Sequence, residues 1–246
     1  MTSAAPAFLS RAEALATDYA VYVAPPIDAR AAGPWPVVVV LDGDYFFDPA
    51  VTAARALQAN GAIPPLGVIG IGYGKPFGDR GNRRGRDYTP TAANEEPGSG
   101  GAAAFLDHLS TSFWPELLER LPIARNRSAL AGHSLSGLFV LYALAQPQPA
   151  FHRAIAGAPS IWWDQRSLLA HLTRRRDVQA SLSAELYIGV GTDETPSMLG
   201  DLALLDQQLA ARPFAGLRVT TQHFPKRDHY NVVPDLFTGG LRALFG

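Results

Sequence analysis

The stretch Ala129-Leu130-Ala131-Gly132-His133-Ser134-Leu135-Ser136-Gly137-Leu138-Phe139 decides the fold of this chain. An apolar run leads into a serine with small residues on both sides, and an apolar segment of helical period follows. This pattern is typical of a nucleophile elbow, where small neighbours allow the helix to pack back against the strand. Gly132, Ser136 and Gly137 are those neighbours, with Ser136 in place of the second glycine of the Gly-x-Ser-x-Gly form. The stretch therefore predicts Ser134 as a nucleophile, and an ordinary glycine-containing turn is the alternative.

Composition limits the classes of protein that this chain can belong to. It has 246 residues, 47% of them hydrophobic, and a net charge of −1. A chain of this length can bury a large core, and we expect one α/β domain over residues 1–246. The near-neutral charge argues against a nucleic-acid partner, because binding phosphates requires a basic field. The absence of cysteine excludes disulfides, thiolate metal sites and a cysteine nucleophile.

The N-terminal residues 1–15 are rich in alanine but carry Arg11 and Glu13 and lack the apolar block of a secretory signal. No stretch has the uninterrupted apolar length that is needed to span a membrane. We therefore expect a soluble, cytoplasmic protein with no membrane partner, or a periplasmic one if a leader has been removed. The oligomeric state is left open.

Apolar runs with strand and helix periods alternate along the chain. Residues 35–41 form a continuous β-branched run, as expected of a strand that is buried on both faces of a parallel sheet. Asp48 and Pro49 suggest an N-cap and first turn of a helix through about residue 58. Further strands are expected at 19–24, 66–73, 127–131, 154–157, 184–190 and 217–224, and further helices at 102–121, 135–146, 164–172, 199–211 and 234–245. The predicted fold is a mostly parallel central sheet with helices on both faces.

The segment from about residue 74 to 101 differs from the rest of the chain. It is dense in glycine, proline, arginine and asparagine and has almost no aliphatic residues. It is too long for a simple connection, and such loops in compact domains are usually lids, binding loops or disordered insertions. In the following helix, Pro115 is expected to cause a kink or a break.

Groups that acyl transfer requires follow four of the predicted strands. They are Asp42-Gly43-Asp44, Ser134, Asp193-Glu194 and His229. In a parallel sheet the carboxyl ends of the strands lie at one edge, where ligands bind. We therefore expect these groups to lie close together.

His229 is the predicted base. A serine hydroxyl needs a base to accept its proton, and His229 follows the last predicted strand, where α/β-hydrolase chain order places this residue. His133 directly precedes the nucleophile and is expected to point elsewhere. The acid that orients the imidazole is expected after residue 190, where periodicity leaves Asp193 and Glu194 as alternatives; both can also be solvated.

The oxyanion of a tetrahedral intermediate requires hydrogen-bond donors. One should be the backbone N–H of Leu135, and the second should be the N–H of Asp44 or Gly43. No cofactor or metal is expected. Gly70-Ile71-Gly72-Tyr73-Gly74 lacks the last glycine of a dinucleotide fingerprint, and Asp42, Asp44 and Asp48 lack the glycine and glutamate of a calcium loop.

Several dispersed motifs carry a resemblance to a known family. They are the elbow, Leu41-Asp42-Gly43-Asp44, Arg86-Asp87-Tyr88-Thr89-Pro90, Ala158-Pro159-Ser160-Ile161-Trp162-Trp163, and the tail from Asp228-His229 to Pro234. From about residue 37 onward the chain resembles the putative-esterase family of α/β-hydrolases, in particular its siderophore (enterobactin) esterase-like branch.

The resemblance implies a serine esterase with Ser134 as nucleophile and His229 as base. The Gly-x-x-acid pattern of related enzymes matches Glu194, although some siderophore esterases are described as using a serine and histidine pair without a clear acid. This chain departs from the family in having Asp228 and Tyr230 beside the histidine.

The resemblance also suggests substrate-side residues. Arg86, together with Arg83 or Arg84, is expected to contact an anionic or catecholate part of the substrate, unless these arginines only solvate the loop. Of Trp162 and Trp163, one is expected in the core and the other beside the pocket, with Trp162 as the substrate-binding candidate.

The predicted activity is hydrolysis of a small-molecule carboxylic ester through an acyl-enzyme. An acyltransferase could use the same residues. A non-catalytic binding protein on a hydrolase fold is the alternative from another class.

Overall fold

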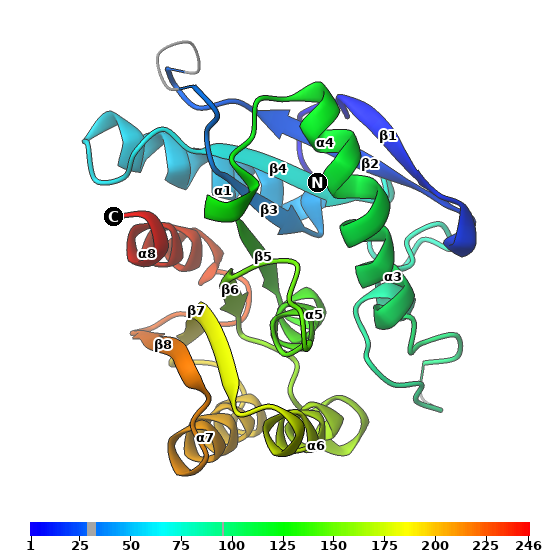
Figure 1. Ribbon diagram of the computed structural model, residues 1–246, viewed down its shortest axis with the longest axis vertical. Coiled ribbons are helices and arrows are strands. Elements are labelled where there is room, and N and C mark those ends of the chain that lie inside the picture. Colours follow the sequence, from blue (N-terminus) through cyan, green and yellow to red (C-terminus); the bar gives the residue numbers. More distant parts are fainter. Residues whose placement is uncertain (29–32, 95) are drawn as a thin grey trace.

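Eight strands form one sheet in the computed structural model, which describes residues 1–28, 33–94 and 96–246 (Figure 1). The strand order is β1-β2-β4-β3-β5-β6-β7-β8. β2 runs antiparallel to both of its neighbours, and all the other pairs are parallel. The mostly parallel α/β sheet that the sequence predicts is confirmed. The strands are β1 (Phe8–Ala12), β2 (Thr17–Ala24), β3 (Val37–Leu41), β4 (Gly67–Gly72), β5 (Ala129–His133), β6 (Arg153–Gly157), β7 (Ser181–Gly191) and β8 (Ala215–Phe224).

Helices cover both faces of the sheet. α1 and α8 pack together on one face, and α3, α4, α5, α6 and α7 supply the apolar side chains that cover the other. The helices are α1 (Gly43–Ala59), α2 (Arg84–Asp87), α3 (Ala102–His108), α4 (Trp114–Arg120), α5 (Leu135–Leu144), α6 (Trp163–Val178), α7 (Pro196–Ala211) and α8 (Val233–Phe245). Shorter turns are η1 (Glu13–Leu15), η2 (Leu109–Phe113) and η3 (Arg125–Arg127).

The valine run of β3 shows why the sheet is buried on both sides. Val37, Val39 and Leu41 pack into the core under α3, α4 and α5, whereas Val38 and Val40 pack into the core under α1 and α8. All five residues of the strand are fully buried. Because successive side chains point to opposite faces, a strand covered by helices on both sides has to be apolar throughout.

The expected start of α1 at Asp48 is wrong. The helix begins at Gly43, and the N–H groups of Tyr45 and Phe46 donate to the carbonyl of Asp42. The Asp48 carboxylate instead accepts hydrogen bonds from the N-terminal segment, including one of 2.7 Å from the Thr2 hydroxyl. Asp48-Pro49 has the local pattern of a helix start, but the donors to the Asp48 carboxylate are Thr2 and Ser3, which lie far away in the sequence.

The long helix after the loop contains a π-helical turn, η2, between α3 and α4. Pro115 is the second residue after this turn and lies in the first turn of α4. Proline has no N–H to donate, so a regular helical hydrogen bond cannot form at this position. The irregularity expected at Pro115 is therefore present as a π turn within a helix that continues.

Part of segment 74–101 is packed into the molecule. It contains the short helix α2, and Asp87, Tyr88 and Thr89 are almost inaccessible to solvent. β1 and its pairing with β2 are further features that the sequence analysis did not predict.

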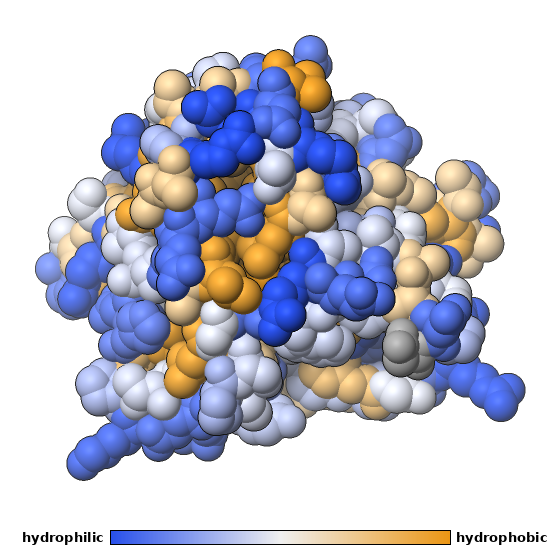
Figure 2. Space-filling model, turned by 90° about the horizontal axis from the view of Figure 1, so that it is seen from below, coloured by the Kyte–Doolittle hydropathy of each residue, from blue (hydrophilic) through white to orange (hydrophobic). Residues whose placement is uncertain are grey.

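Figure 2 shows a face on which hydrophobic side chains gather in a hollow that hydrophilic side chains surround. None of the described helices is both long and apolar enough to cross a membrane.

Candidate active site

Ser134 lies between β5 and α5 in the strained conformation of an elbow. Its φ is 62° and its ψ is −121°, in a region that residues with side chains rarely adopt. A Cβ atom at Gly132 would lie 2.4 Å from the carbonyl oxygen of Ser136, which explains why a residue without a side chain is needed there. The local sequence therefore forces the serine to the tip of the turn.

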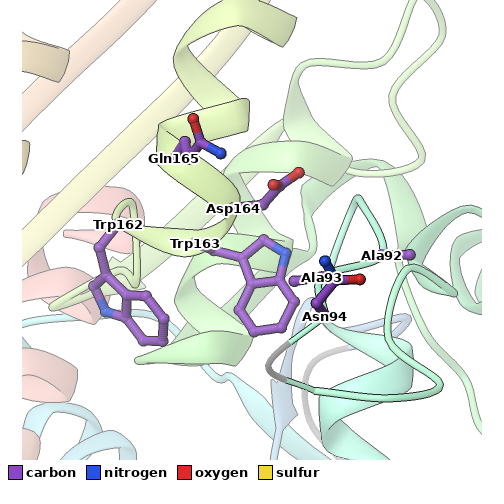
Figure 3. Close-up of a pocket in the computed structure, with 7 residues that line it drawn as sticks. All are labelled: Ala92, Ala93, Asn94, Trp162, Trp163, Asp164 and Gln165. Carbon is purple, nitrogen blue, oxygen red and sulfur yellow. The ribbon is translucent and has the colours of Figure 1, made fainter.

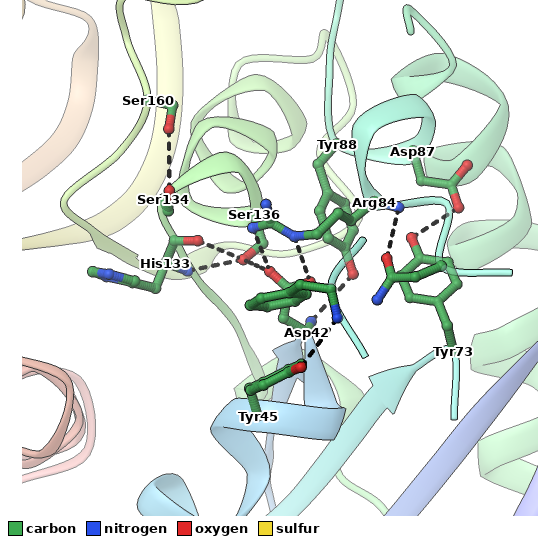
Figure 4. A network of polar contacts seen from close by, with 12 residues as sticks. Asp42, Tyr45, Tyr73, Arg84, Asp87, Tyr88, His133, Ser134, Ser136 and Ser160 are labelled. Atoms are coloured by element: carbon green, nitrogen blue, oxygen red, sulfur yellow. Dashed lines mark hydrogen bonds and ion pairs between the residues drawn. The ribbon is translucent and has the colours of Figure 1, made fainter. Parts of the chain in front are cut away.

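The hydroxyl of Ser136 accounts for its place in the elbow. It accepts a hydrogen bond of 3.0 Å from the backbone N–H of His133 and lies 2.8 Å from both the His133 carbonyl and the Asp42 carboxylate. A hydroxyl carries one proton, so it can donate to only one of these two acceptors at a time. Ser136 thus ties the elbow to the end of β3, a contact that glycine could not make (Figure 4).

Arg84 joins the same network from segment 74–101. Its Nε and Nη2 atoms lie 3.0 Å and 2.9 Å from the two carboxylate oxygens of Asp42, whose side chain is fully buried. Burial alone would lower the pKa of Arg84, but the Asp42 carboxylate, with smaller contributions from Tyr88 and Tyr73, offsets this effect, and the pKa is raised. The guanidinium also lies 4.5 Å from the ring centre of Phe77. A charged pair therefore fastens the segment to the elbow.

His229 and Glu194 are in direct contact. The Nδ1 atom of His229 lies 2.5 Å from Oε1 of Glu194, and the Glu194 side chain is almost completely buried. Asp193, the alternative acid, is exposed and accepts a hydrogen bond from the hydroxyl of Thr192. The structure thus brings Glu194, and not Asp193, to the imidazole.

A close backbone approach places this pair. The N–H of Asp193 donates to the carbonyl of Arg227 at 2.9 Å, which joins the turn after β7 to the loop after β8. A Cβ atom at Gly191 would lie 1.9 Å from the same carbonyl oxygen. Only glycine fits at the end of β7 without moving the loop that carries His229.

Ser134 and His229 line one pocket of about 330 Å³. Its walls are mainly aromatic and apolar, with the Arg84 guanidinium as the fixed charge. The other residues that line it are Tyr45, Phe46, Phe77, His133, Tyr230 and Val233. The site therefore combines a hydroxyl, an imidazole held by a carboxylate, and an apolar wall.

The predicted oxyanion donors lie in the first turns of two helices. Leu135 begins α5, and Gly43 and Asp44 begin α1. The first N–H groups of a helix have no acceptor within the helix, and the helix dipole favours negative charge there. The carboxylate of Asp44 is buried and accepts hydrogen bonds from the Tyr22 hydroxyl and the Tyr73 N–H, so its side chain serves the fold.

The structure does not bring Arg86 into the pocket of Ser134. Its guanidinium contacts the Asp87 carboxylate at 2.6 Å, the Leu15 carbonyl at 3.0 Å and the Thr17 hydroxyl at 3.0 Å. Arg84 lines the pocket instead. Both arginines lie in the same short helix, and the sequence alone does not show which of them faces the serine.

Trp162 is 46% exposed and lines a second pocket of about 390 Å³ between the start of α6 and residues 92–94 (Figure 3). Trp163 is buried, and its indole N–H donates to the carbonyl of Thr91. The α6 turn beside them is left-handed, with positive φ at Asp164, Gln165 and Arg166.

Two further residues at the site were not identified from the sequence. The hydroxyl of Ser160 lies 3.4 Å from that of Ser134, and Ser160 is buried (Figure 4). The other is His133, which was expected only to point elsewhere than at the nucleophile: its Nε2 atom lies 2.8 Å from the carbonyl oxygen of His229. A signal for Ser160 existed in the motif 158–163, but no sequence signal pairs His133 with the loop of His229. Among the residues described, no group of three or more metal-ligating side chains could hold a metal ion.

The fold and the elbow define an α/β-hydrolase with the layout of a serine hydrolase. The family profile described as "Putative esterase" matches residues 12–228. The chain belongs to this family and is a carboxylic ester hydrolase.

Named relatives and a solved structure agree with this assignment. The chain is 30% identical over 247 residues to the ferri-bacillibactin esterase BesA of Bacillus subtilis, with 91% of this chain and 83% of that protein covered. It is 34% identical over 196 residues to the siderophore triacetylfusarinine C esterase of Aspergillus fumigatus, with 76% and 66% covered. The crystal structure of BES protein from Bacillus cereus superposes with a TM-score of 0.86 at 24% identity, with 100% of this chain and 96% of that chain covered.

Proposed function

We propose that Ser134 is the nucleophile of this esterase, that His229 is its general base, and that Glu194 orients and stabilises the imidazole. One observation carries this assignment: His229 contacts a buried carboxylate through Nδ1 and lines the same pocket as Ser134. A neutral imidazole whose Nδ1 proton is held by a carboxylate presents Nε2 as the acceptor for a hydroxyl proton.

The proposed reaction has two halves. His229 accepts the proton of Ser134 as the hydroxyl oxygen attacks the ester carbonyl, and it then gives that proton to the departing alcohol. A water molecule next loses a proton to His229 and attacks the acyl-enzyme, and His229 returns this proton to the Ser134 oxygen as the acid is released. We assign the oxyanion donors to the N–H groups of Leu135 and of Asp44 or Gly43, which lie in the first turns of α5 and α1. Loss of one such donor typically costs about 3 kcal/mol of transition-state stabilisation.

We further propose that the substrate is an ester of the siderophore type. Support comes from the two named relatives, which are a ferri-bacillibactin esterase and a siderophore triacetylfusarinine C esterase. The aromatic wall made by Tyr45, Phe77 and Tyr230 offers large apolar contact to an acyl or alcohol group beside the scissile bond. Trp162 is assigned to the substrate side of the second pocket.

Labelling with a fluorophosphonate probe tests the nucleophile. We expect covalent labelling of the unmodified protein and none of Ser134→Ala, whose kcat for p-nitrophenyl butyrate should fall by at least about 10³-fold. Ser183→Ala is the matched control, because Ser183 is exposed and lies early in β7, at the opposite end of that strand from the turn that carries Glu194. Full labelling of Ser134→Ala would refute the assignment.

A panel of esters tests the substrate class. It should contain a catecholate trilactone siderophore, a hydroxamate ester siderophore, p-nitrophenyl esters of increasing chain length and a feruloyl ester. We expect the highest kcat/KM for one of the two siderophores. A higher kcat/KM for a simple alkyl ester would contradict the proposed substrate while leaving the catalytic residues in place.

A further inference from the structure

The histidine that precedes the nucleophile reaches across the active site to the loop of the base. His133 is the last residue of β5, and its Nε2 atom lies 2.8 Å from the backbone carbonyl oxygen of His229. The two imidazole rings are 4.6 Å apart. This contact joins residues that are 96 positions apart in the chain.

The chemistry of this contact fixes the state of the His133 ring. A carbonyl oxygen only accepts hydrogen bonds, so Nε2 carries the proton and Nδ1 is bare in the neutral ring. Nδ1 is buried, has no hydrogen-bond partner among the residues that the structure describes, and faces Gly157, where a Cβ atom would lie 2.8 Å away. The ring is 3% exposed, and the edge-on ring of Phe46 packs against it.

Burial, followed by the nearby His229, lowers the pKa of His133 to about 3. Arg84 also disfavours a positive charge on the ring. The ring therefore stays neutral at the pH values where an unperturbed histidine side chain changes its charge. Its hydrogen bond to the loop is present in both protonation states of the base.

We propose that His133 is a positioning residue that sets the distance between nucleophile and base. It is covalently joined to Ser134 and hydrogen-bonded to the main chain of His229, so a single side chain links the nucleophile to the loop of the base. Glu194 contacts the imidazole ring of His229 through Nδ1, and His133 contacts the backbone carbonyl of the same residue. This inference rests on the proposed roles of Ser134 and His229.

A matched pair of substitutions separates positioning from packing. Glutamine retains an N–H donor at nearly the reach of Nε2, whereas methionine has a similar length, fills the apolar site and has no donor. We expect His133→Gln to keep kcat within about fivefold of the unmodified protein. We expect His133→Met to lose about 10- to 100-fold in kcat with little change in KM, since misplacing a catalytic group by about 1 Å can cost that much.

The two variants should rank in the opposite order when thermal stability is measured in place of kcat. Methionine suits a buried apolar site better than glutamine, so His133→Met should have the higher Tm of the two variants. A residue that serves packing alone would give an activity that follows Tm. Equal kcat values for the two variants, or a more active His133→Met, would overturn the proposal.

Two further measurements keep the outcomes distinct. Ser134→Ala and His229→Ala are assayed beside the pair: if either retains full activity, the proposed function fails, whatever His133 does. If both variants of His133 fail to fold, nitrogen-15 NMR of the unmodified protein decides. We expect His133 as the Nε2–H tautomer with no titration between pH 5 and 8, and titration near pH 6.5 would overturn the proposal.

Discussion

Ser134 holds a backbone conformation whose free-energy cost is on the order of 1–3 kcal/mol for a residue with a side chain. Main-chain hydrogen bonds keep it there: its N–H donates to the carbonyl of Gly157 at 2.9 Å, and its carbonyl accepts from the N–H groups of Leu138 and Ser160. The nucleophile is therefore fixed from both α5 and the end of β6. Its hydroxyl position depends on backbone contacts that no side-chain substitution removes directly.

Glu194→Gln tests the acid of the proposed triad. Glutamine retains the size of glutamate but removes the charge that stabilises the imidazolium, so we expect kcat to fall by about 10²- to 10⁴-fold at pH 7.5. Asp193→Asn is the matched control and should stay within about twofold, because Asp193 is exposed. Steady-state kinetics with p-nitrophenyl butyrate measures both. A larger loss of kcat in Asp193→Asn than in Glu194→Gln would show that Asp193, and not Glu194, is the acid.

The choice between Asp193 and Glu194 shows the limit of sequence reasoning for single residues. Both follow β7 within three residues, and any periodic pattern fits either of them. The Asp193 N–H bonds to the Arg227 carbonyl, and the adjacent Glu194 carboxylate meets the imidazole. The hydrogen bond between Asp193 and Arg227 joins two loops that are far apart in the sequence, so it cannot be predicted from the local sequence.

Among the elements, segment 74–101 is attached to the molecule through two buried carboxylates. Asp42 accepts from Arg84, and Asp87 accepts from Arg86 and from the hydroxyl groups of Tyr19 and Tyr73. Both carboxylate side chains are fully buried. The segment therefore behaves as a docked element: Arg84 joins it to Asp42 at the end of β3, and Asp87 joins it to Tyr19 in β2 and to Tyr73 just after β4.

Arg84→Met and Arg86→Met separate the two anchors. Each leaves a buried carboxylate without its cation, so each should lower the free energy of unfolding by about 3–5 kcal/mol, measured by urea denaturation. Only Arg84→Met should also lower kcat/KM, because Arg84 lines the pocket and holds Asp42, the partner of Ser136. Arg83→Met is the control, since Arg83 is exposed and should change stability by less than about 0.5 kcal/mol.

The same variants test the earlier expectation for Arg86. A direct substrate contact predicts a higher KM of Arg86→Met for anionic esters than for neutral ones. The observed contacts predict the same KM ratio as in the unmodified protein. A selective effect on anionic esters would show that Arg86 reaches the substrate.

Helix ends were harder to predict than the helices themselves. Asp48-Pro49 satisfies the local rule for a helix start, yet α1 begins five residues earlier, at Gly43. The start is set by β3, which ends at Leu41 and delivers the chain directly into the first turn. The Asp48 carboxylate accepts hydrogen bonds from residues 2 and 3 and does not cap the helix, and this long-range contact could not be predicted from the local sequence.

At the scale of the whole molecule, the sequence predicted the sheet but not its order. Runs such as residues 37–41 are apolar on both faces, which is sufficient to predict a covered parallel strand. The insertion of β3 between β4 and β5 follows from crossovers that leave no local signature. The convergence of Ser134, His229 and Glu194 was predictable because a parallel sheet carries all its strand ends to one edge.

Buried histidines predict how the stability of the whole molecule depends on pH. Burial lowers the pKa of His108, His133 and His171, to about 3 for His133. In the unfolded chain these histidines have pKa values near 6.5, so as the pH falls they bind protons in the unfolded state before they do so in the native state. The stability that these neutral rings contribute is complete above pH 6.5 and is lost progressively as the pH falls from there toward 3.

For His133 the loss should reach about 1.4 kcal/mol per pH unit below about pH 6.5. Urea unfolding at pH 7.5 and pH 5.0 measures it, in a range where most carboxylates remain ionised. His133→Gln removes one titrating ring, so its free energy of unfolding should fall by about 2 kcal/mol less than that of the unmodified protein between these two pH values. Equal losses in the two proteins would mean that His133 is not held neutral by its surroundings, and the rigid link between elbow and base would then lack its fixed protonation state.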